Sequence, residues 1–146
     1  MANLNNLIEV VQLNNTADIT HADVKSEYVD LAGYPGCILV ACVGTMTGAD
    51  ASNYVVPTVQ ESDTTNDADF SAATDVVASP AFSKVGSTSE DNVTQVSVYT
   101  GSKRYVRILW DVTSAGSYPT GPVVGLAILS KALREPPAAP TTGTAA

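Results

Sequence analysis

Residues that commonly perform catalysis are few in this sequence, and they form no recognisable motif. His21 is the single histidine, and it lies in the polar segment DITHADVK. Serine is abundant, but the sequence has no G-x-S-x-G, no S-x-x-K and no phosphate-binding glycine loop. A general base acts only within hydrogen-bond reach of a partner, so we interpret His21 as a solvated loop residue. We expect a chain that is not an enzyme and that needs no cofactor.

A metal site is the second kind of chemistry to consider, because carboxylate and amide oxygens suit a hard cation such as Ca²⁺. Four such side chains lie close together in the sequence: Asp63, Asn66, Asp67 and Asp69. Their spacing is not that of an EF-hand loop, which needs glycine at its sixth position and glutamate at its twelfth. A solvated acidic loop is the favoured interpretation. Zinc is not expected, since His21, Cys37 and Cys42 have neither the number nor the spacing of four ligands.

The charge of the chain argues against nucleic acid as a partner. The 146 residues include only seven Lys and Arg, and the net charge is -8, whereas nucleic-acid binding needs a basic stripe. Lys103, Arg104 and Arg107 do cluster, but a short basic run on a strand is typical of a solvated face or a subunit contact. Charged residues make up only 15% of the chain, against a usual value of about 25%. Such a surface suits close packing against neighbours.

Nothing in the sequence predicts export or membrane insertion. The N-terminal segment MANLNNLIEVVQLNN lacks the basic start and the long apolar run of a signal peptide. No apolar run approaches the ~18 residues of a membrane span. Cys37 and Cys42 are five positions apart, which points them to opposite faces of a strand, so they cannot pair there. We expect synthesis in a host cytoplasm and two free thiols in a reducing compartment.

The elements that would position any site are short β segments. The continuous apolar run CILVACVGTMTG, which begins at residue 37, and the segment VVGLAIL at 123–129 predict core strands. Weaker strand patterns cover 7–13, a short piece from residue 28, 53–61, and short pieces around Val76, Val77 and Phe82. Pro57 cannot donate to a ladder, so it predicts an edge position or a bulge and an interrupted strand. Phe70 is expected to reach the core from the acidic loop.

A hairpin is predicted between residues 93 and 112. VTQVSVY and RYVRILWDV both alternate, and TGSK between them has the composition of a turn. On the second arm, the period of two puts Trp110 on the same face as Val106 and Ile108, which we expect to be the core side. Tyr105, Arg107, Leu109 and Asp111 then lie on the opposite face.

These segments predict an all-β fold: an antiparallel β-sandwich or a jelly-roll-like barrel. Residues 28–131 form the β domain. Residues 1–27 precede it as an N-terminal arm or edge strand. Residues 132–146 are rich in Pro, Ala and Thr and hold almost no large apolar side chain, so they are expected to form an extended or disordered tail.

Two short motifs carry a resemblance to a known family. Q-E-S-D precedes the acidic loop, and G-x-K-R-Y-V-R lies near the C-terminus: Gln60, Glu61, Ser62 and Asp63, with Gly101, Lys103, Arg104, Tyr105, Val106 and Arg107. Over residues 28–131 the chain resembles the capsid decoration, or head cement, proteins of tailed phages. The resemblance implies a virion protein on the capsid exterior. It assigns no active site.

Our leading hypothesis is a decoration protein that binds the major capsid protein and two further copies of itself, as a homotrimer, without nucleic acid or membrane. The residues expected at contacts are Arg104, Tyr105, Arg107 and Arg134, together with the N-terminal arm and the tail. The alternative is a glycan- or receptor-binding module on a phage tail or spike, built on Trp110 and the six tyrosines. It is weakened because Trp110 is predicted to point into the core.

Overall fold

The computed structural model describes residues 8–13, 17–74, 76, 82–87 and 91–130, and every structural statement below concerns these residues. They form two five-stranded antiparallel sheets. Sheet A contains β1 (Ile8–Gln12), β2 (Ala17–Ile19), β5 (Cys37–Val43), β8 (Val93–Tyr99) and β10 (Gly121–Ser130). Sheet B contains β3 (Val24–Lys25), β4 (Val29–Asp30), β6 (Tyr54–Ser62), β7 (Ser71–Ala72) and β9 (Tyr105–Thr113), and a single 3-10 turn, η2 (Asp67–Asp69), lies between β6 and β7.

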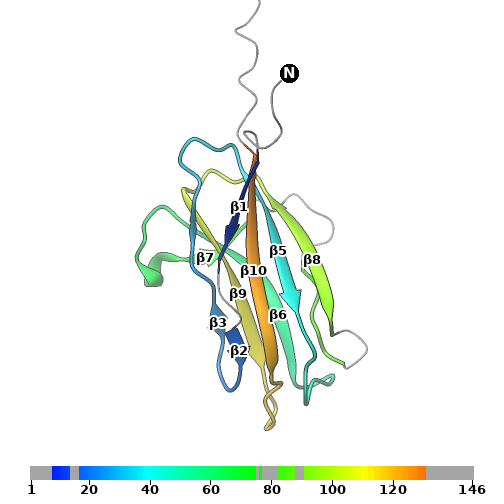
Figure 1. Ribbon diagram of the computed structural model, residues 1–146. Coiled ribbons are helices and arrows are strands. Elements are labelled where there is room, and N and C mark those ends of the chain that lie inside the picture. The colour runs from blue at the N-terminus through cyan, green and yellow to red at the C-terminus, as the bar shows by residue number, and fades with distance from the viewer. Residues whose placement is uncertain (1–7, 14–16, 75, 77–81, 88–90, 131–146) are drawn as a thin grey trace, which may run out of the picture.

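The two sheets pack face to face, with sheet A in front of sheet B in Figure 1. Sheet A has the order β1-β10-β5-β8, and β2 pairs with the start of β10. Sheet B has the order β3-β9-β6-β7, and β4 pairs with the start of β9. The predicted all-β class and the antiparallel sandwich are confirmed.

The core lies between the inner faces of the sheets, where alternate residues of each strand point inward. Sheet A contributes Leu39 and Val123, and sheet B contributes Ile108 and Trp110, all four with no accessible surface. Each large apolar side chain buried in this way stabilises the fold by about 1.5–3 kcal/mol. The predicted inward direction of Trp110 is confirmed.

The predicted hairpin between β8 and β9 is wrong. β8 pairs with β5 in sheet A along its whole length, whereas β9 pairs with β6 in sheet B. The segment between them therefore crosses from one sheet to the other. Each arm buries its inward side chains in the core from its own sheet: Tyr99 on β8 and Val106 on β9 both have no accessible surface. A hairpin and a crossover produce the same alternation in sequence.

Pro57 lies in an uninterrupted strand, β6, at a gap in the pairing between β6 and the chain on the side away from β9. Val55 exchanges backbone hydrogen bonds of 3.1 and 2.8 Å with Val85, and Val59 accepts one of 2.9 Å from Ala73. These bonds leave β6 on the side away from β9. Backbone groups two residues apart on a strand point to the same side, so the Pro57 nitrogen also points away from β9. The missing N–H therefore removes no hydrogen bond between β6 and β9. The predicted interruption is wrong, and β6 as a whole lies between β9 and β7, so Pro57 is accommodated at a gap in the pairing and not on an edge strand.

The described part of residues 1–27 belongs to the sheets. β1 pairs with β10 at one edge of sheet A, as the edge-strand alternative expects, and β3 pairs with β9. Leu13 and Ile19 are buried in the core. The tail at 132–146, Arg134, Val77 and Leu7 lie outside the described residues.

Candidate interaction surfaces

The outer face of sheet A is made mostly of apolar side chains over β1, β10, β5 and β8, and we call this part the apolar face. Its members are the outward residues of β1, β10, β5 and β8: Ile8, Val10, Gln12, Pro122, Val124, Leu126, Ile128, Ser130, Ile38, Val40, Cys42, Thr94, Val96 and Val98. None of them is an Asp, Glu, Lys or Arg. Asp18 of β2, which lies opposite Pro122, is an exposed carboxylate at the border of the face. The face points toward the viewer in Figure 1.

Cross-strand register arranges these side chains in rows. One row runs from Val10 through Ile128 and Ile38 to Val98. Directly opposite residues have Cβ atoms about 4.5–5.5 Å apart, so this row forms a continuous apolar strip. Val10 is 61% exposed and Val96 is 49% exposed. With about 32 Å² of sheet per side chain, the face covers roughly 450 Å² of sheet. This is within the range of the largest apolar patch on a monomeric protein, a patch that is often functional.

Sequence reasoning missed this surface, although a signal was present. The apolar run from residue 37 predicted a core strand, but only the inward residues of β5 contribute to the core cluster. Val40 points outward and lies outside that cluster. It is nevertheless only 9% exposed, because its outward neighbours Leu126 and Val96 on the adjacent strands cover its flanks. The signal was the apolar character of both faces in β5 and β10.

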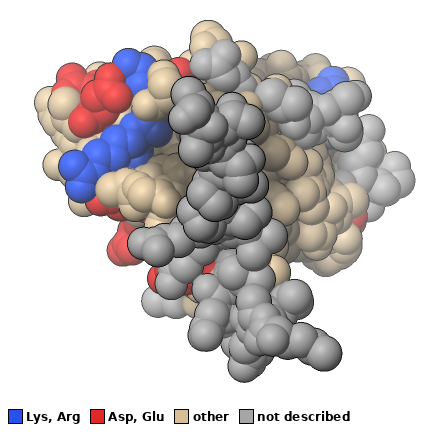
Figure 2. Space-filling view, turned by 90° about the horizontal axis from the view of Figure 1, so that it is seen from above, with Lys and Arg blue, Asp and Glu red and all other residues tan. Residues whose placement is uncertain are grey.

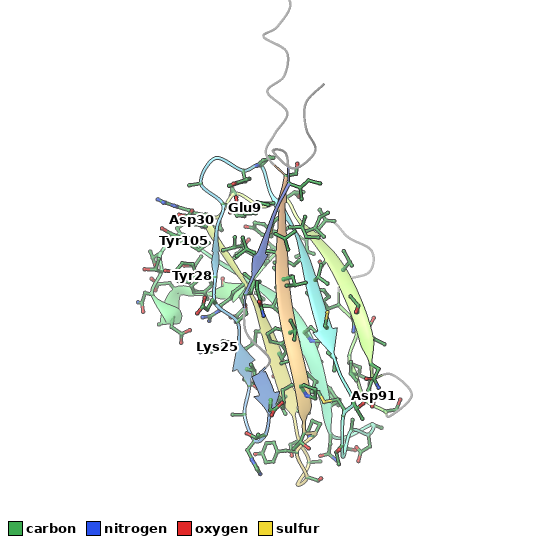
Figure 3. All side chains as sticks on the ribbon, viewed as in Figure 1. Glu9, Lys25, Tyr28, Asp30, Asp91 and Tyr105 are labelled. Atoms are coloured by element: carbon green, nitrogen blue, oxygen red, sulfur yellow. The ribbon has the colours of Figure 1, made fainter. Side chains whose placement is uncertain are left out.

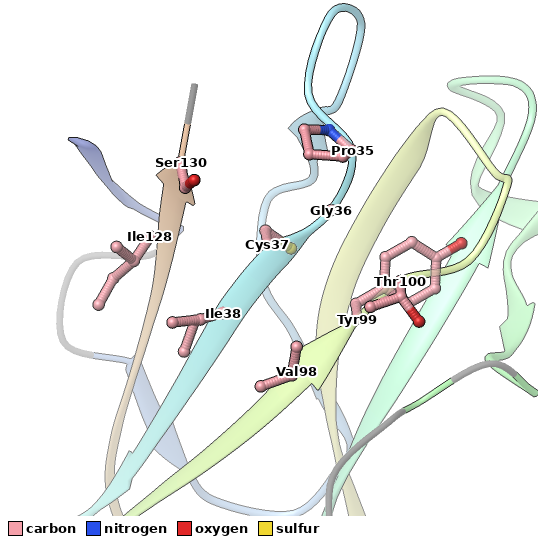
Figure 4. A pocket seen from close by; sticks show the side chains of 9 residues that line it. All are labelled: Pro35, Gly36, Cys37, Ile38, Val98, Tyr99, Thr100, Ile128 and Ser130. Carbon is pink, nitrogen blue, oxygen red and sulfur yellow. The ribbon is translucent and has the colours of Figure 1, made fainter. Parts of the chain in front are cut away.

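A hollow of about 210 Å³ lies at one end of the apolar face. Figure 4 shows its lining residues: Pro35, Gly36, Cys37, Ile38, Val98, Tyr99, Thr100, Ile128 and Ser130. The backbone of Gly36 packs directly on β8, since a Cβ there would lie 2.3 Å from the Tyr99 carbonyl oxygen. Burial raises the pKa of the Cys37 thiol to about 12, so this thiol is protonated at neutral pH and is a poor nucleophile.

The opposite end of the same face has a second hollow, lined by Cys42, Val43, Gly44, Asn92, Val93, Thr94, Pro122 and Val124. Its volume is about 320 Å³. The apolar face is thus hollowed at both ends. Cys37 lines the first hollow and Cys42 the second, from opposite faces of β5, and both thiols are free, as predicted.

Arg104, a residue expected at contacts, is exposed on the sheet B side and already paired within the chain. Its Nε donates to Asp30 Oδ1 at 3.0 Å and its Nη2 donates to Asp30 Oδ2 at 2.9 Å. These hydrogen bonds, with one from the Ala32 backbone N–H, hold the pKa of Asp30 below its ordinary value. The guanidinium also lies 5.1 Å from the ring centre of Tyr105.

Tyr105 belongs to a ladder of rings on the outer face of sheet B. Tyr28, which is 44% exposed, meets Tyr105 edge to face at 5.2 Å and stacks on Phe70 at 6.2 Å. Figure 3 shows Tyr28, Asp30 and Tyr105 together on this side of the molecule. Phe70 is buried, as expected, but outside the core cluster: it lies beneath Arg107, 4.1 Å from the guanidinium carbon.

Arg107 lies inside its own chain, which corrects the solvated face expected for the basic cluster. Only 7% of its side chain is exposed. Its Nε donates to Gln60 Oε1 at 2.8 Å and its Nη1 donates to Asp67 Oδ1. The side chain therefore links β9 to β6 and to η2. Burial follows from Phe70, which covers the inner surface of the guanidinium, a contact that sequence alternation alone cannot show.

The acidic loop at 63–69 turns its carboxylates toward basic side chains. Asp67 accepts from Lys25 at 2.7 Å as well as from Arg107, and these two hydrogen bonds hold its pKa below the ordinary value. Asp63 pairs with Lys103. Seen from above, acidic and basic side chains gather on one side of the molecule (Figure 2). Within the described residues, no three His, Cys, Asp or Glu side chains converge as metal ligands.

His21 is exposed, and its ring centre lies 5.4 Å from that of Tyr118, which is also exposed. The loop position predicted for His21 is therefore the one observed. Trp110, the centre of the predicted glycan platform, is fully buried and cannot stack on a sugar in this fold.

Comparison with known proteins adds no family: no family model matches the chain, and neither does any curated protein. The described residues contain no helix of sufficient length and apolarity to cross a membrane. Functional inference therefore starts from the surfaces of this chain.

Proposed function

We propose that this chain is a structural protein that binds the outside of a larger particle. The observation that carries the proposal is the apolar face: an uncharged sheet surface on a chain with a net charge of -8. Exposed apolar area costs free energy in water at about 25 cal/mol per Å². A protein partner that covers this face recovers that free energy.

The particle we propose is the head of a tailed phage, because of the resemblance carried by the Q-E-S-D and G-x-K-R-Y-V-R motifs. In that role the chain bridges neighbouring copies of the major capsid protein on the exterior, as a homotrimer. The Q-E-S-D strand end is structurally central here, since Glu61 is buried and hydrogen-bonded to Tyr99. That placement supports a role for the motif in the fold of the module and not in catalysis.

The mechanism is stabilisation by mass action. A module that binds only the assembled shell shifts the equilibrium away from rupture by its binding free energy. Each contact can be weak, because many copies on one shell act together. Such a mechanism needs no reacting group, and the exposed position of His21 and the protonated Cys37 thiol are consistent with it.

The test uses heads assembled without this polypeptide. Adding the purified full-length chain should give saturable co-sedimentation at hundreds of copies per head, and it should raise the temperature at which the heads release DNA. Bovine serum albumin at the same concentration serves as the control. If the chain co-sediments neither with unexpanded heads nor with expanded heads, the proposal is contradicted.

A further inference from the structure

We infer that the hollow of Figure 4 receives one large aliphatic or aromatic side chain from an uncharged segment of the shell protein, and that this segment lies across the apolar face. This inference rests on the proposed function and names the contact site within it. Four observations support it: the lining of the hollow, the size of the hollow, the rigidity of the hollow and the distribution of charge over the molecule.

The lining selects an apolar occupant. Ile38, Val98 and Ile128 converge on the hollow from three adjacent strands, one residue from each. Thr100 and Ser130 contribute the side-chain hydroxyls, and no charged group is present to pair with a charge on a ligand. Burial of an unpaired charge would be costly, so a charged or strongly polar group is disfavoured.

The size selects a single side chain. Pockets that bind drug-sized ligands have volumes of about 300–1,000 Å³, and this hollow has about 210 Å³. Interfaces between proteins commonly place one aromatic or aliphatic residue in a pocket near the centre of a flatter contact. The apolar face supplies that flatter contact.

The hollow is also rigid, because its base is tied to both sheets. Gly36 packs against the β8 backbone. Tyr99, at the end of β8, is fully buried and donates a 2.6 Å hydrogen bond to Glu61 of sheet B. A preformed pocket loses little conformational entropy when it is filled.

The distribution of charge identifies the side of the molecule that stays in water. The four ion pairs given for the described residues all lie on the sheet B side, and they join Lys25, Lys103, Arg104 and Arg107 to Asp67, Asp63 and Asp30. The apolar face has none. Docking around the hollow, at the end of the apolar face away from Asp18, therefore desolvates no charge of this chain, provided that the partner surface is uncharged as well.

The area favours the shell over a second copy as the occupant. Two apolar faces of about 450 Å² would bury about 900 Å² in total, against about 1,600 Å² for a standard stable interface. A free dimer through this face would be weak. On a shell, the same area is sufficient because neighbouring contacts reinforce each other.

The first experiment compares full-length variants for binding to heads that lack the chain. Ile38→Asp places a charge beside the hollow and should weaken binding at least tenfold. Tyr118→Asp adds the same charge at an exposed position, 43% accessible, away from the apolar face, and should change affinity less than twofold. Thermal melting of each variant confirms that it is folded. Equal binding by folded Ile38→Asp and the unmodified chain would overturn the inference while leaving the proposed function in place.

The second experiment identifies the occupant. A photo-crosslinking residue in place of Val96, beside the hollow, should join the bound chain to a peptide of the shell protein. Crosslinks to a second copy, or to residues 131–146 of the chain itself, would overturn the inference even if the heads bind normally. Complete absence of head binding by the unmodified chain would instead remove the proposed function and the inference together.

Discussion

The phenol of Tyr99 donates a 2.6 Å hydrogen bond to the carboxylate of Glu61, and this bond joins sheet A to sheet B. Tyr99 has no accessible surface and Glu61 is 8% exposed. The same phenol oxygen accepts a 3.2 Å hydrogen bond from the Lys103 backbone N–H. One hydroxyl thus connects β8, β6 and the crossover that follows β8.

Tyr99→Phe should lower the stability of the domain by about 1–3 kcal/mol, because it removes a donor from a buried carboxylate. For a domain of this size the melting temperature should fall by about 3 °C per kcal/mol. Glu61→Gln, which retains an acceptor for the phenol, is the matched control and should cost less. Equal melting temperatures for Tyr99→Phe and the unmodified protein would show that the bond contributes nothing to stability.

Arg107→Ala should destabilise the chain more than Arg104→Ala, although the two residues lie three positions apart. Arg107 is nearly buried, stacks on Phe70 and donates to Gln60 and Asp67, so its loss should cost about 2 kcal/mol. Arg104 forms an exposed pair with Asp30, and such pairs contribute about 1 kcal/mol or less. Urea unfolding of both variants provides the measurement, and the reverse order of stability would contradict the structure.

Acid should weaken the attachment of the 63–69 loop. The folded-state pKa of Asp67 lies below its ordinary value of 3.8 because Lys25 and Arg107 donate to it. A depressed pKa contributes stability above the unfolded-state value, and this contribution is lost as the pH falls through the folded-state value. Asp67→Asn should therefore reduce the dependence of unfolding free energy on pH below about pH 4. Superimposable pH profiles for the two proteins would exclude this contribution.

The two thiols should react at different rates with iodoacetamide at pH 8. Cys37 is 5% exposed and burial raises its pKa to about 12, so almost no thiolate is present to react. Cys42 is half-buried on the apolar face. Mass spectrometry should find modification at Cys42 first, and modification of both residues only after denaturation. Mild oxidation should leave the two unlinked within one chain, since they lie on opposite faces of β5.

Much of the fold could be predicted from local pattern. The apolar run predicted as a core strand from residue 37 contains β5, which ends at Val43, and the predicted strands at 93–99 and 123–129 match β8 and most of β10. Pro57 was assigned to an edge or a bulge because its missing N–H excludes one side of a ladder, but β6 lies between β9 and β7, and Pro57 falls at a gap in the pairing. The contact residues were harder to predict: the structure buries Arg107 against Phe70, and the conclusion that the apolar face is a surface depends on which side of each strand faces the other sheet.

By itself the sequence determined where the strands lie and which residues share a face, because side chains alternate with a period of two whatever the strand pairs with. It also determined that Trp110 points with Val106 and Ile108. Only the tertiary structure decided that β8 and β9 belong to different sheets, and which of the two apolar faces of β5 is buried. Both decisions depend on contacts between residues distant in sequence, since the two faces of an apolar strand are distinguishable only once the second sheet covers one of them.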